Sequence, residues 1–269
     1  MKSIIVTGAS SGIGRAATVK LSKSGYTVFG LARSYDKLTE MSAALPKDRY
    51  FPIKFDITKP ETLEKVVNDI SAKGPIFGLV NNAGYVEPGA FEDICMEDLR
   101  IQFETNFFGI VGLTKQVLPG MLQRREGRIV NVSSMAGLVS LPLIGAYCAT
   151  KHALEAFSEA LRMELWNTGI KVVNINPGVI ETNIHTITNA KIARLKDSRF
   201  KEAYRKYLQR IPEGMPASAV ADVIVKSIVL TKPKPRYLIG SWKEKVGVTL
   251  RPYIPDEVFH SQVAKRVLT

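Results

Sequence analysis

A glycine-rich turn between an apolar run and a helical pattern constrains the fold of this chain more than any other feature. The run Ser3 to Thr7 is β-branched, and a helical pattern of apolar residues begins at Ala16 and stops near Gly25. The turn between them contains Gly8, Gly12 and Gly14. A strand, a glycine turn and a helix form the nucleotide-binding βα unit, in which the backbone approaches a pyrophosphate at the helix N-terminus. The spacing G-x-x-x-G-x-G differs from the commoner G-x-G-x-x-G, so a simple tight turn is the structural alternative.

Strand-like and helix-like segments continue to alternate along the 269 residues. The expected strands are 3–7, 26–32, 50–55, 77–80, 128–133, 170–176 and 237–239, and the expected helices are 16–25, 37–45, 60–72, 96–124, 147–167 and 217–230. This alternation predicts an α/β fold, a doubly wound parallel sheet of about seven strands with helices on both faces. A hydrophobic content of 45% supplies the core for one domain over 1–269.

Three side chains near the middle of the chain suit carbonyl chemistry. Tyr147 and Lys151 are four residues apart, so they share one face of a helix, and Ser134 ends the strand at 128–133. We expect the ammonium to lower the tyrosine pKa from its free value of about 10, which suits a general acid or base. The serine hydroxyl would hold the reacting oxygen. The pair alone is a weak signal, since a packed ring and a solvated amine have the same spacing.

The end of the second expected strand bears on the choice of cofactor. NAD-binding units usually place an acid there, which takes the ribose hydroxyls. Here the strand 26–32 is followed by Arg33, and Arg15 adds a second cation. Because arginine pairs with phosphate, we expect NADP(H) to be preferred over NAD(H). The alternative is that both arginines are merely surface charges.

Composition argues against several other classes of protein. The net charge is +12, but no basic motif interleaved with aromatic residues indicates nucleic acid. The three histidines are scattered, so we expect no metal site. A reduced, cytoplasmic setting is expected from three observations. The two cysteines lie in unlike contexts, the first strand is so close to the start that it leaves no room for a signal peptide, and no long apolar run is present.

The motifs together resemble the short-chain dehydrogenase/reductase family. They are Thr7-Gly-Ala-Ser-Ser-Gly-Ile-Gly14, Asn81-Asn-Ala-Gly84, Asn106, Ser134 with Tyr147 and Lys151, and Pro177-Gly178 with Thr182, in the family's order. Segments 146–155 and 236–240 look most like the branch of 17β-hydroxysteroid and retinol dehydrogenases. The resemblance implies a single-domain Rossmann fold and an NADP(H)-dependent oxidoreductase that interconverts a carbonyl and an alcohol.

The resemblance also implies residue roles. Tyr147 would be the acid or base, Lys151 would lower its pKa, Ser134 would position the substrate, and Asn106 would anchor a water in a proton relay. The implied cofactor-binding residues are Gly8, Ser10, Ser11, Gly12, Ile13, Gly14, Arg15, Arg33, Asp56, Ile57, Asn82, Ala83, Gly84, Tyr147, Lys151, Pro177, Gly178, Ile180 and Thr182. A homodimer or homotetramer would form through helices 96–124 and 147–167.

The substrate and the tail are the least constrained parts. A basic, amphipathic segment at about 183–215 is expected to be a lid over a hydrophobic carbonyl of steroid, retinoid or fatty type, with an acidic group attracted by its cations. The candidate pocket residues are Glu92, Met135, Val139, Leu141 and Leu143. The extension at about 241–269 is interpreted as a packed helix pair or as a peripheral membrane contact. Alternatives for the whole chain are a cofactor-responsive regulatory protein with little turnover and a nucleotide-sugar epimerase.

Overall fold

A seven-stranded parallel sheet forms the centre of the computed structural model, which describes residues 2–181, 184–193, 195, 197–209 and 214–269. Its strands are β1 (Ser3–Thr7), β2 (Thr27–Ala32), β3 (Tyr50–Lys54), β4 (Ile76–Asn81), β5 (Gly127–Val132), β6 (Ile170–Pro177) and β9 (Arg236–Ile239). The spatial order is β3-β2-β1-β4-β5-β6-β9, so the chain changes direction across the sheet at β1. The predicted doubly wound sheet is confirmed, because parallel neighbours require the crossovers that the helical segments provide.

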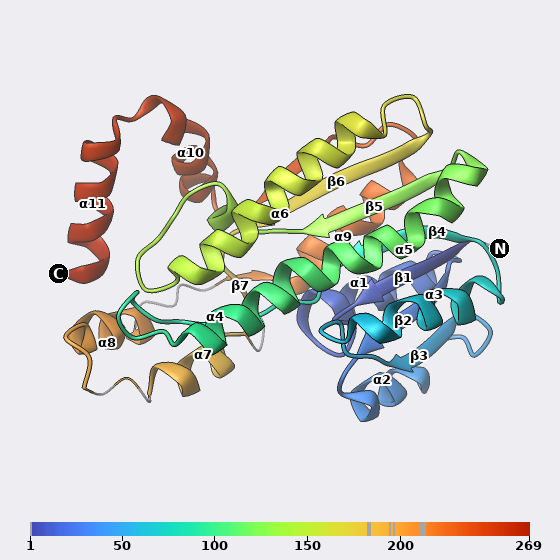
Figure 1. The fold of residues 1–269 in the computed structure, drawn as a ribbon, viewed down its shortest axis with the longest axis horizontal. Coiled ribbons are helices and arrows are strands. Elements are labelled where there is room, and N and C mark those ends of the chain that lie inside the picture. The colour runs from blue at the N-terminus through green and yellow to red at the C-terminus, as the bar shows by residue number, and fades with distance from the viewer. Residues whose placement is uncertain (1, 182–183, 194, 196, 210–213) are drawn as a thin grey trace.

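Helices cover both faces of the sheet, as Figure 1 shows. One face carries α1 (Gly12–Lys23), α2 (Tyr35–Ser42) and α9 (Ala217–Val229), and the other carries α3 (Leu63–Ser71), α5 (Gly109–Arg124) and α6 (Gly145–Glu164). The residues of the inner strands β1, β2, β4 and β5 are buried on both sides, with Ile4, Ile5 and Val6 at 0% exposure, whereas the edge strands β3 and β9 are partly exposed. Such two-sided burial explains why the strands read as continuous apolar runs rather than alternating ones.

The helix expected at 96–124 is interrupted, which corrects the sequence-based boundaries. It consists of α4 (Met96–Phe103), a π-helical turn η2 (Glu104–Phe108) and α5. A π turn inserts one extra residue and is frequent at functional sites. Here the turn contains Asn106, whose amide is fully buried and hydrogen-bonded to a separate loop.

Two smaller units lie beyond the carboxyl end of β5 (Figure 1). The lid contains α7 (Ile184–Ile192) and α8 (Lys201–Gln209), and is bracketed by the paired short strands β7 (Ile180–Glu181) and β8 (Met215–Pro216). The C-terminal arm contains α10 (Trp242–Leu250), a 3-10 turn η4 (Arg251–Tyr253) and α11 (Asp256–Leu268).

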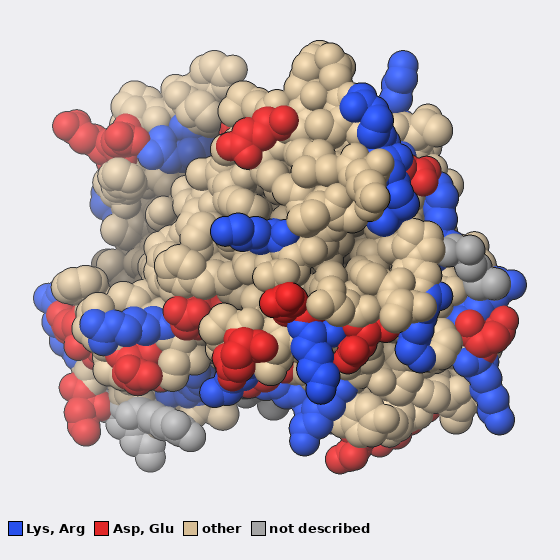
Figure 2. Space-filling model, turned by 45° about the vertical axis from the view of Figure 1, so that its right-hand side comes forward, with Lys and Arg blue, Asp and Glu red and all other residues tan. Residues whose placement is uncertain are grey.

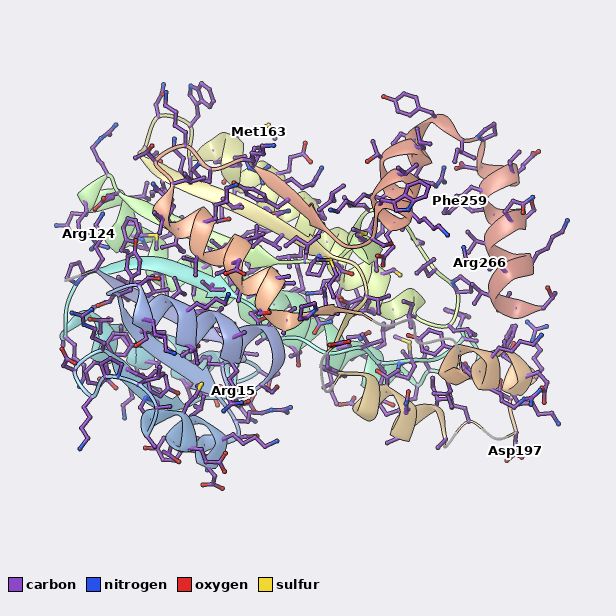
Figure 3. All side chains as sticks on the ribbon, turned by 180° about the vertical axis from the view of Figure 1, so that it is seen from behind. Arg15, Arg124, Met163, Asp197, Phe259 and Arg266 are labelled. Atoms are coloured by element: carbon purple, nitrogen blue, oxygen red, sulfur yellow. The ribbon has the colours of Figure 1, made fainter. Side chains whose placement is uncertain are left out.

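The arm differs from the expected packed helix pair. Neither α10 nor α11 contains a buried residue, and α11 contacts α8 of the lid. Figure 3 shows the arm, with Phe259 and Arg266 labelled, standing apart from the sheet. The arm is therefore held by α8 of the lid and, through Glu244 of α10, by the loop after β6 rather than by the main core.

Charge on the surface is mixed. On the face drawn in Figure 2, basic and acidic side chains lie next to one another over the lower half. Within the described part of the chain, no helix is long and apolar enough to span a bilayer.

Candidate active site

A cavity of about 600 Å³ opens at the carboxyl ends of the central strands, where the strand order reverses. Eleven predicted cofactor residues line it: Gly8, Ser10, Ser11, Gly12, Ile13, Arg33, Asp56, Ile57, Asn82, Ala83 and Gly84. The lining also contains residues that sequence reasoning did not assign to the site: Leu31, Ala32, Ser34, Lys37, Phe55, Tyr85 and Thr105. The structure thus brings most of the predicted cofactor residues together in one place.

The glycine turn leaves room for a ligand that needs close backbone approach. Gly8 has a φ of +65°, and a Cβ on Gly14 would lie 2.2 Å from the Gly8 carbonyl oxygen, so neither position tolerates a side chain well. Ser11 caps α1 without a hydrogen bond from its side chain to the first turn. The N-terminal amides and the dipole of α1 therefore face the cavity, as pyrophosphate binding requires.

Thr7 lines the cavity and connects two strands at its edge, which its position inside the first motif did not reveal. Its hydroxyl accepts hydrogen bonds from the backbone amides of Asn82 and Ala83, both at 2.9 Å. The side-chain Nδ2 of Asn82 donates back to the Thr7 carbonyl at 3.0 Å. These bonds join the ends of β1 and β4 and fix the two sides of the nucleotide cavity relative to each other.

The cationic rim of the cavity differs in part from the prediction. Arg33 lines it as expected, together with Ser34 and Lys37 from the start of α2. Arg15 is exposed in the first turn of α1, and the lining defined by the described residues does not include it. The sequence analysis did not identify Lys37 as a residue of the rim, because its position there depends on how the first turn of α2 lies relative to the end of β2.

Tyr147, Ser134 and Lys151 converge beside this cavity. The Ser134 hydroxyl lies close enough to the Tyr147 phenol to lower its pKa, and it donates a hydrogen bond to the Pro177 carbonyl at 3.3 Å. Lys151 is 4% exposed; its Nζ donates to the Val132 carbonyl at 2.9 Å and lies 5.8 Å from the Tyr147 ring centroid. The spacing in the sequence therefore did place the two groups on one helix face.

The electrostatics of the ligand-free site oppose the expected lowering of the tyrosine pKa. Burial raises the pKa of Tyr147 to about 12, while its hydrogen bond with Ser134 acts in the other direction. Burial also lowers the pKa of Lys151 to about 8, and the Glu155 carboxylate opposes that shift. Desolvation penalises the charged form of both groups, and this cost was not visible in the sequence.

Asn106 connects the π turn to the loop after β4. Its Oδ1 accepts from the Tyr85 amide at 3.0 Å, and its Nδ2 donates to the Tyr85 carbonyl at 2.9 Å and to Thr150 at 3.1 Å. A Cβ on Gly84 would lie 3.1 Å from Asn106 Oδ1 and 3.6 Å from Lys151 Nζ. Asn106 is thus both a satisfied interior amide and a close neighbour of the catalytic candidates.

The loop after β6 is fixed by the main sheet and by the arm. The Gly178 amide donates to the Ile239 carbonyl at 2.7 Å, and the Val179 amide donates to Glu244 of α10 at 3.0 Å. Glu244 also completes a capping box with Ser241. Ile180 is buried, whereas Thr182, the last predicted cofactor residue, lies outside the described residues.

The five candidate pocket residues fall in different environments. Met135 and Leu143 are buried, Val139 and Leu141 are half-buried, and Glu92 is exposed and paired with Arg199 of the lid at 2.9 Å. Sequence reasoning missed one distant neighbour of Tyr147: Tyr207 of α8, which acts electrostatically on Tyr147. Its proximity depends on how α8 packs against the site.

The described side chains contain no group of three or more His, Cys, Asp or Glu residues that could hold a metal ion. Both cysteines, the exposed Cys95 and the buried Cys148, are free thiols. The reactive groups of the site are therefore hydroxyl, phenol, ammonium and amide.

Several known proteins resemble the chain over almost its whole length. The uncharacterised oxidoreductase YusZ of Bacillus subtilis is 37% identical, covering 100% of this chain and 99% of that protein. The NADPH-dependent 3-dehydrocapnine reductase of Ornithobacterium rhinotracheale is 33% identical, with 98% of each covered. The 3-ketodihydrosphingosine reductase of Bacteroides thetaiotaomicron is 31% identical, covering 98% of this chain and 96% of that protein.

Solved structures and a family model agree with these relatives. A short-chain dehydrogenase from Streptomyces avermitilis has a TM-score of 0.80 at 32% identity, covering 98% of this chain and 95% of that one. One from Burkholderia phymatum in complex with NAD has a TM-score of 0.82 at 25% identity, covering 94% and 93%. The family model described as short chain dehydrogenase matches residues 2–193. With the nucleotide cavity beside Tyr147 and Lys151, these matches establish that the chain belongs to the short-chain dehydrogenase/reductase family of oxidoreductases.

Proposed function

We propose that the protein is an NADPH-dependent reductase that converts a long-chain ketone into an alcohol. The observation that carries this proposal is the convergence of Tyr147, Ser134 and the buried Lys151 beside a nucleotide-sized cavity, with Lys151 one helical turn from Tyr147. When bound, the nicotinamide would supply the hydride. The chain's own groups would supply the proton and hold the carbonyl.

The protonation of Tyr147 favours the reducing direction. A phenol with a pKa of about 12 keeps its proton at neutral pH, so Tyr147 can give that proton to a carbonyl oxygen. Ser134 would donate a second hydrogen bond to the same oxygen as negative charge develops on it. Lys151, with Asn106 on the other side of Gly84, would return a proton to the phenolate through a water-linked relay.

The rim of the cavity supports NADP(H) over NAD(H). Arg33, Ser34 and Lys37 lie at the end of β2, where a 2′-phosphate would add two negative charges. An arginine fork and a nearby ammonium suit a phosphate, and the acid of the described lining, Asp56, follows the neighbouring strand β3 rather than β2. The 3-dehydrocapnine reductase is NADPH-dependent, although the Burkholderia structure contains NAD.

The lid supports a fatty substrate. Leu195, Phe200, Tyr204, Tyr207 and Leu208 pack with Ala90, Leu143, Ile192 and the end of α11 into one apolar cluster next to Tyr147. Two relatives, at 33% and 31% identity, are reductases named for 3-dehydrocapnine and 3-ketodihydrosphingosine. We infer a 3-keto compound with a long alkyl chain, in preference to a steroid or a retinoid.

Basic residues of the lid tether it to neighbouring segments. Lys191 pairs with Glu87 and Arg199 with Glu92. Lys206 donates to the carbonyl of Thr269 at the end of α11. These bonds hold the lid to the loop after β4 and to the arm, so we assign recognition of the substrate to its alkyl chain rather than to an acidic group.

The direct test follows NADPH oxidation at 340 nm with 3-ketodihydrosphingosine, with a short-chain 3-keto amine, with a steroid ketone and with retinal. We expect turnover of the long-chain ketone only, lost in the Tyr147→Phe variant. A preference for the short analogue would refute the substrate class. Undiminished turnover in Tyr147→Phe would refute the catalytic assignment.

The exposed apolar residues on the outer helices support a homo-oligomer. Met96, Ile101, Phe108 and Leu122 are 57%, 43%, 51% and 40% exposed on α4, the π turn and α5, and Met163 is 65% exposed on α6. Two copies that packed these helices together would remove the apolar side chains from water. Light scattering during size-exclusion chromatography tests this, and a monomeric mass at micromolar concentration would contradict it.

A further inference from the structure

A buried carboxylate lies one helical turn beyond the lysine of the proposed relay. Glu155 of α6 is 6% exposed and accepts three hydrogen bonds. They come from Asn174 Nδ2 at 2.7 Å, Asn176 Nδ2 at 2.6 Å and Arg236 Nη2 at 2.8 Å. Burying a carboxylate is costly unless charge and hydrogen bonds compensate, and here both oxygens are occupied.

The same network reaches the serine of the site. Asn176 Nδ2, which donates to Glu155, also donates to the Ser134 carbonyl at 3.0 Å. Ser134 in turn contacts Tyr147 through its hydroxyl. One side chain therefore connects the carboxylate to the backbone of the residue that would hold the substrate oxygen.

Charge connects Glu155 to Lys151 as well. The lysine is 4% exposed, and burial lowers its pKa to about 8. The negative charge of the Glu155 carboxylate raises the Lys151 pKa and so opposes the effect of burial. The other charged or titratable groups facing this region are Arg236 of β9, Arg162 of α6 and Tyr147. Arg236 is 40% exposed, so solvent screens its charge, whereas the Glu155 side chain is 7% exposed and is screened much less.

We propose that Glu155 is a positioning residue that keeps Lys151 an ammonium and, through Asn176, fixes the backbone of Ser134. The proposal rests on the function proposed above, because Lys151 and Ser134 matter only if they serve carbonyl reduction. Glu155 itself touches neither the substrate nor the cofactor cavity. Arg236 is the counter-charge that allows the carboxylate to be buried.

The first test measures the protonation of Lys151 directly, without any need for turnover. Protein labelled with 13C at lysine Cε is titrated by NMR, and the Lys151 resonance is identified by its loss in Lys151→Met. We compare the wild type with Glu155→Gln and with the control Glu159→Gln, which changes an exposed acid one turn further along α6.

We expect the wild-type midpoint near pH 8, a midpoint about one unit lower in Glu155→Gln, and no change in Glu159→Gln. Glutamine preserves the shape, and Asn174 and Asn176 can rotate their amides to accept from it, since both Oδ1 atoms are buried without a partner in the described structure. An unshifted midpoint in Glu155→Gln would overturn the proposal.

The second test measures kcat/KM for ketone reduction against pH. Loss of the Lys151 proton should set the alkaline limb, so Glu155→Gln should be about tenfold slower near pH 8.5 and nearly normal near pH 6. A uniform loss at all pH values in a folded variant would indicate a merely structural role and would overturn the proposal. If the wild type reduces no ketone, the proposed function fails, while the NMR titration still decides the effect of Glu155 on Lys151.

A second variant keeps the proposal testable if Glu155→Gln does not fold. Arg236→Gln removes a positive charge beside the carboxylate and leaves Glu155 in place. The midpoint of Lys151 should then rise, in the direction opposite to that in Glu155→Gln. A fall or no change would refute the electrostatic coupling.

Discussion

Replacing Arg33 by alanine should weaken NADPH binding while leaving NADH binding nearly unchanged. Arg33 lines the rim of the cavity at the end of β2, and its side chain is exposed. Hydrogen bonds to charged groups contribute about 1.5–3 kcal/mol, and exposure favours the lower end of that range. A loss of about 1.5–2 kcal/mol corresponds to an increase of about 10- to 30-fold in the Kd for NADPH.

Lys37 limits the size of the effect. It lies on the same rim in the first turn of α2, so one cation remains near the phosphate after the substitution. The double variant Arg33→Ala/Lys37→Ala should therefore lose more NADPH affinity than either single variant. Isothermal titration calorimetry with both nucleotides gives the ratio of the two Kd values, which isolates the contribution of the phosphate.

Arg15→Ala is the matched control, because Arg15 is an exposed arginine outside the described lining of the cavity. It should change neither Kd by more than about twofold, apart from the weak effect of net charge at low salt. Equal losses for NADPH and NADH in Arg33→Ala would refute the phosphate assignment. A larger loss in Arg15→Ala would show that the sequence-based pairing of Arg15 with the phosphate was right and that the cavity assignment was wrong.

Three further perturbations test the site. Tyr147→Phe should lower kcat, measured by stopped-flow, by about 100-fold or more, while the Kd for NADPH, measured by calorimetry, stays within about threefold. A small fall in kcat would contradict the role of Tyr147 as proton donor. Burial lowers the pKa of Lys151 from 10.5 to about 8. Between pH 8 and 10.5 the folded state therefore binds fewer protons than the unfolded state, so the free energy of unfolding should rise with pH in this range. The free energy of unfolding of the wild type in urea should therefore increase by up to about 3 kcal/mol relative to that of Lys151→Met from pH 8 to 10.5. The same pH dependence in both proteins would refute the lowered pKa of Lys151. Gly14→Ala should lower the free energy of unfolding by about 1–3 kcal/mol and weaken the binding of both nucleotides, because its Cβ would lie 2.2 Å from a carbonyl oxygen. Gly145→Ala, which has open space around its Cβ, should have the same melting temperature as the wild type.

The sequence predicted those parts of the molecule that local pattern determines. The strand–glycine–helix unit at the start and the parallel sheet follow from the alternation of apolar runs with helical patterns, and the shared face of Tyr147 and Lys151 follows from their spacing. The residues that line the cavity were implied by the family resemblance, and they lie together because parallel strands bring their carboxyl ends to one edge.

Features that depend on distant packing were not predictable. The π turn at Asn106 forms around the backbone of Tyr85, 21 residues away. The expected fall in the pKa of Tyr147 was opposed by burial, which exists only once the fold encloses α6. The sequence analysis did not single out Glu155, since its partner Arg236 lies 81 residues further along the chain.

The contact between Glu244 and the loop after β6 restricts how tails can be exchanged within this family. The carboxylate accepts from the Val179 amide and fills the space next to Gly178, where a Cβ would lie 2.3 Å from Glu244 Oε1. A chimaera that replaced the arm with the tail of a relative would have to transfer this glutamate together with the glycine it faces. The C-terminal arm is therefore not an interchangeable module, and grafting it to alter specificity would also alter the loop at the end of β6.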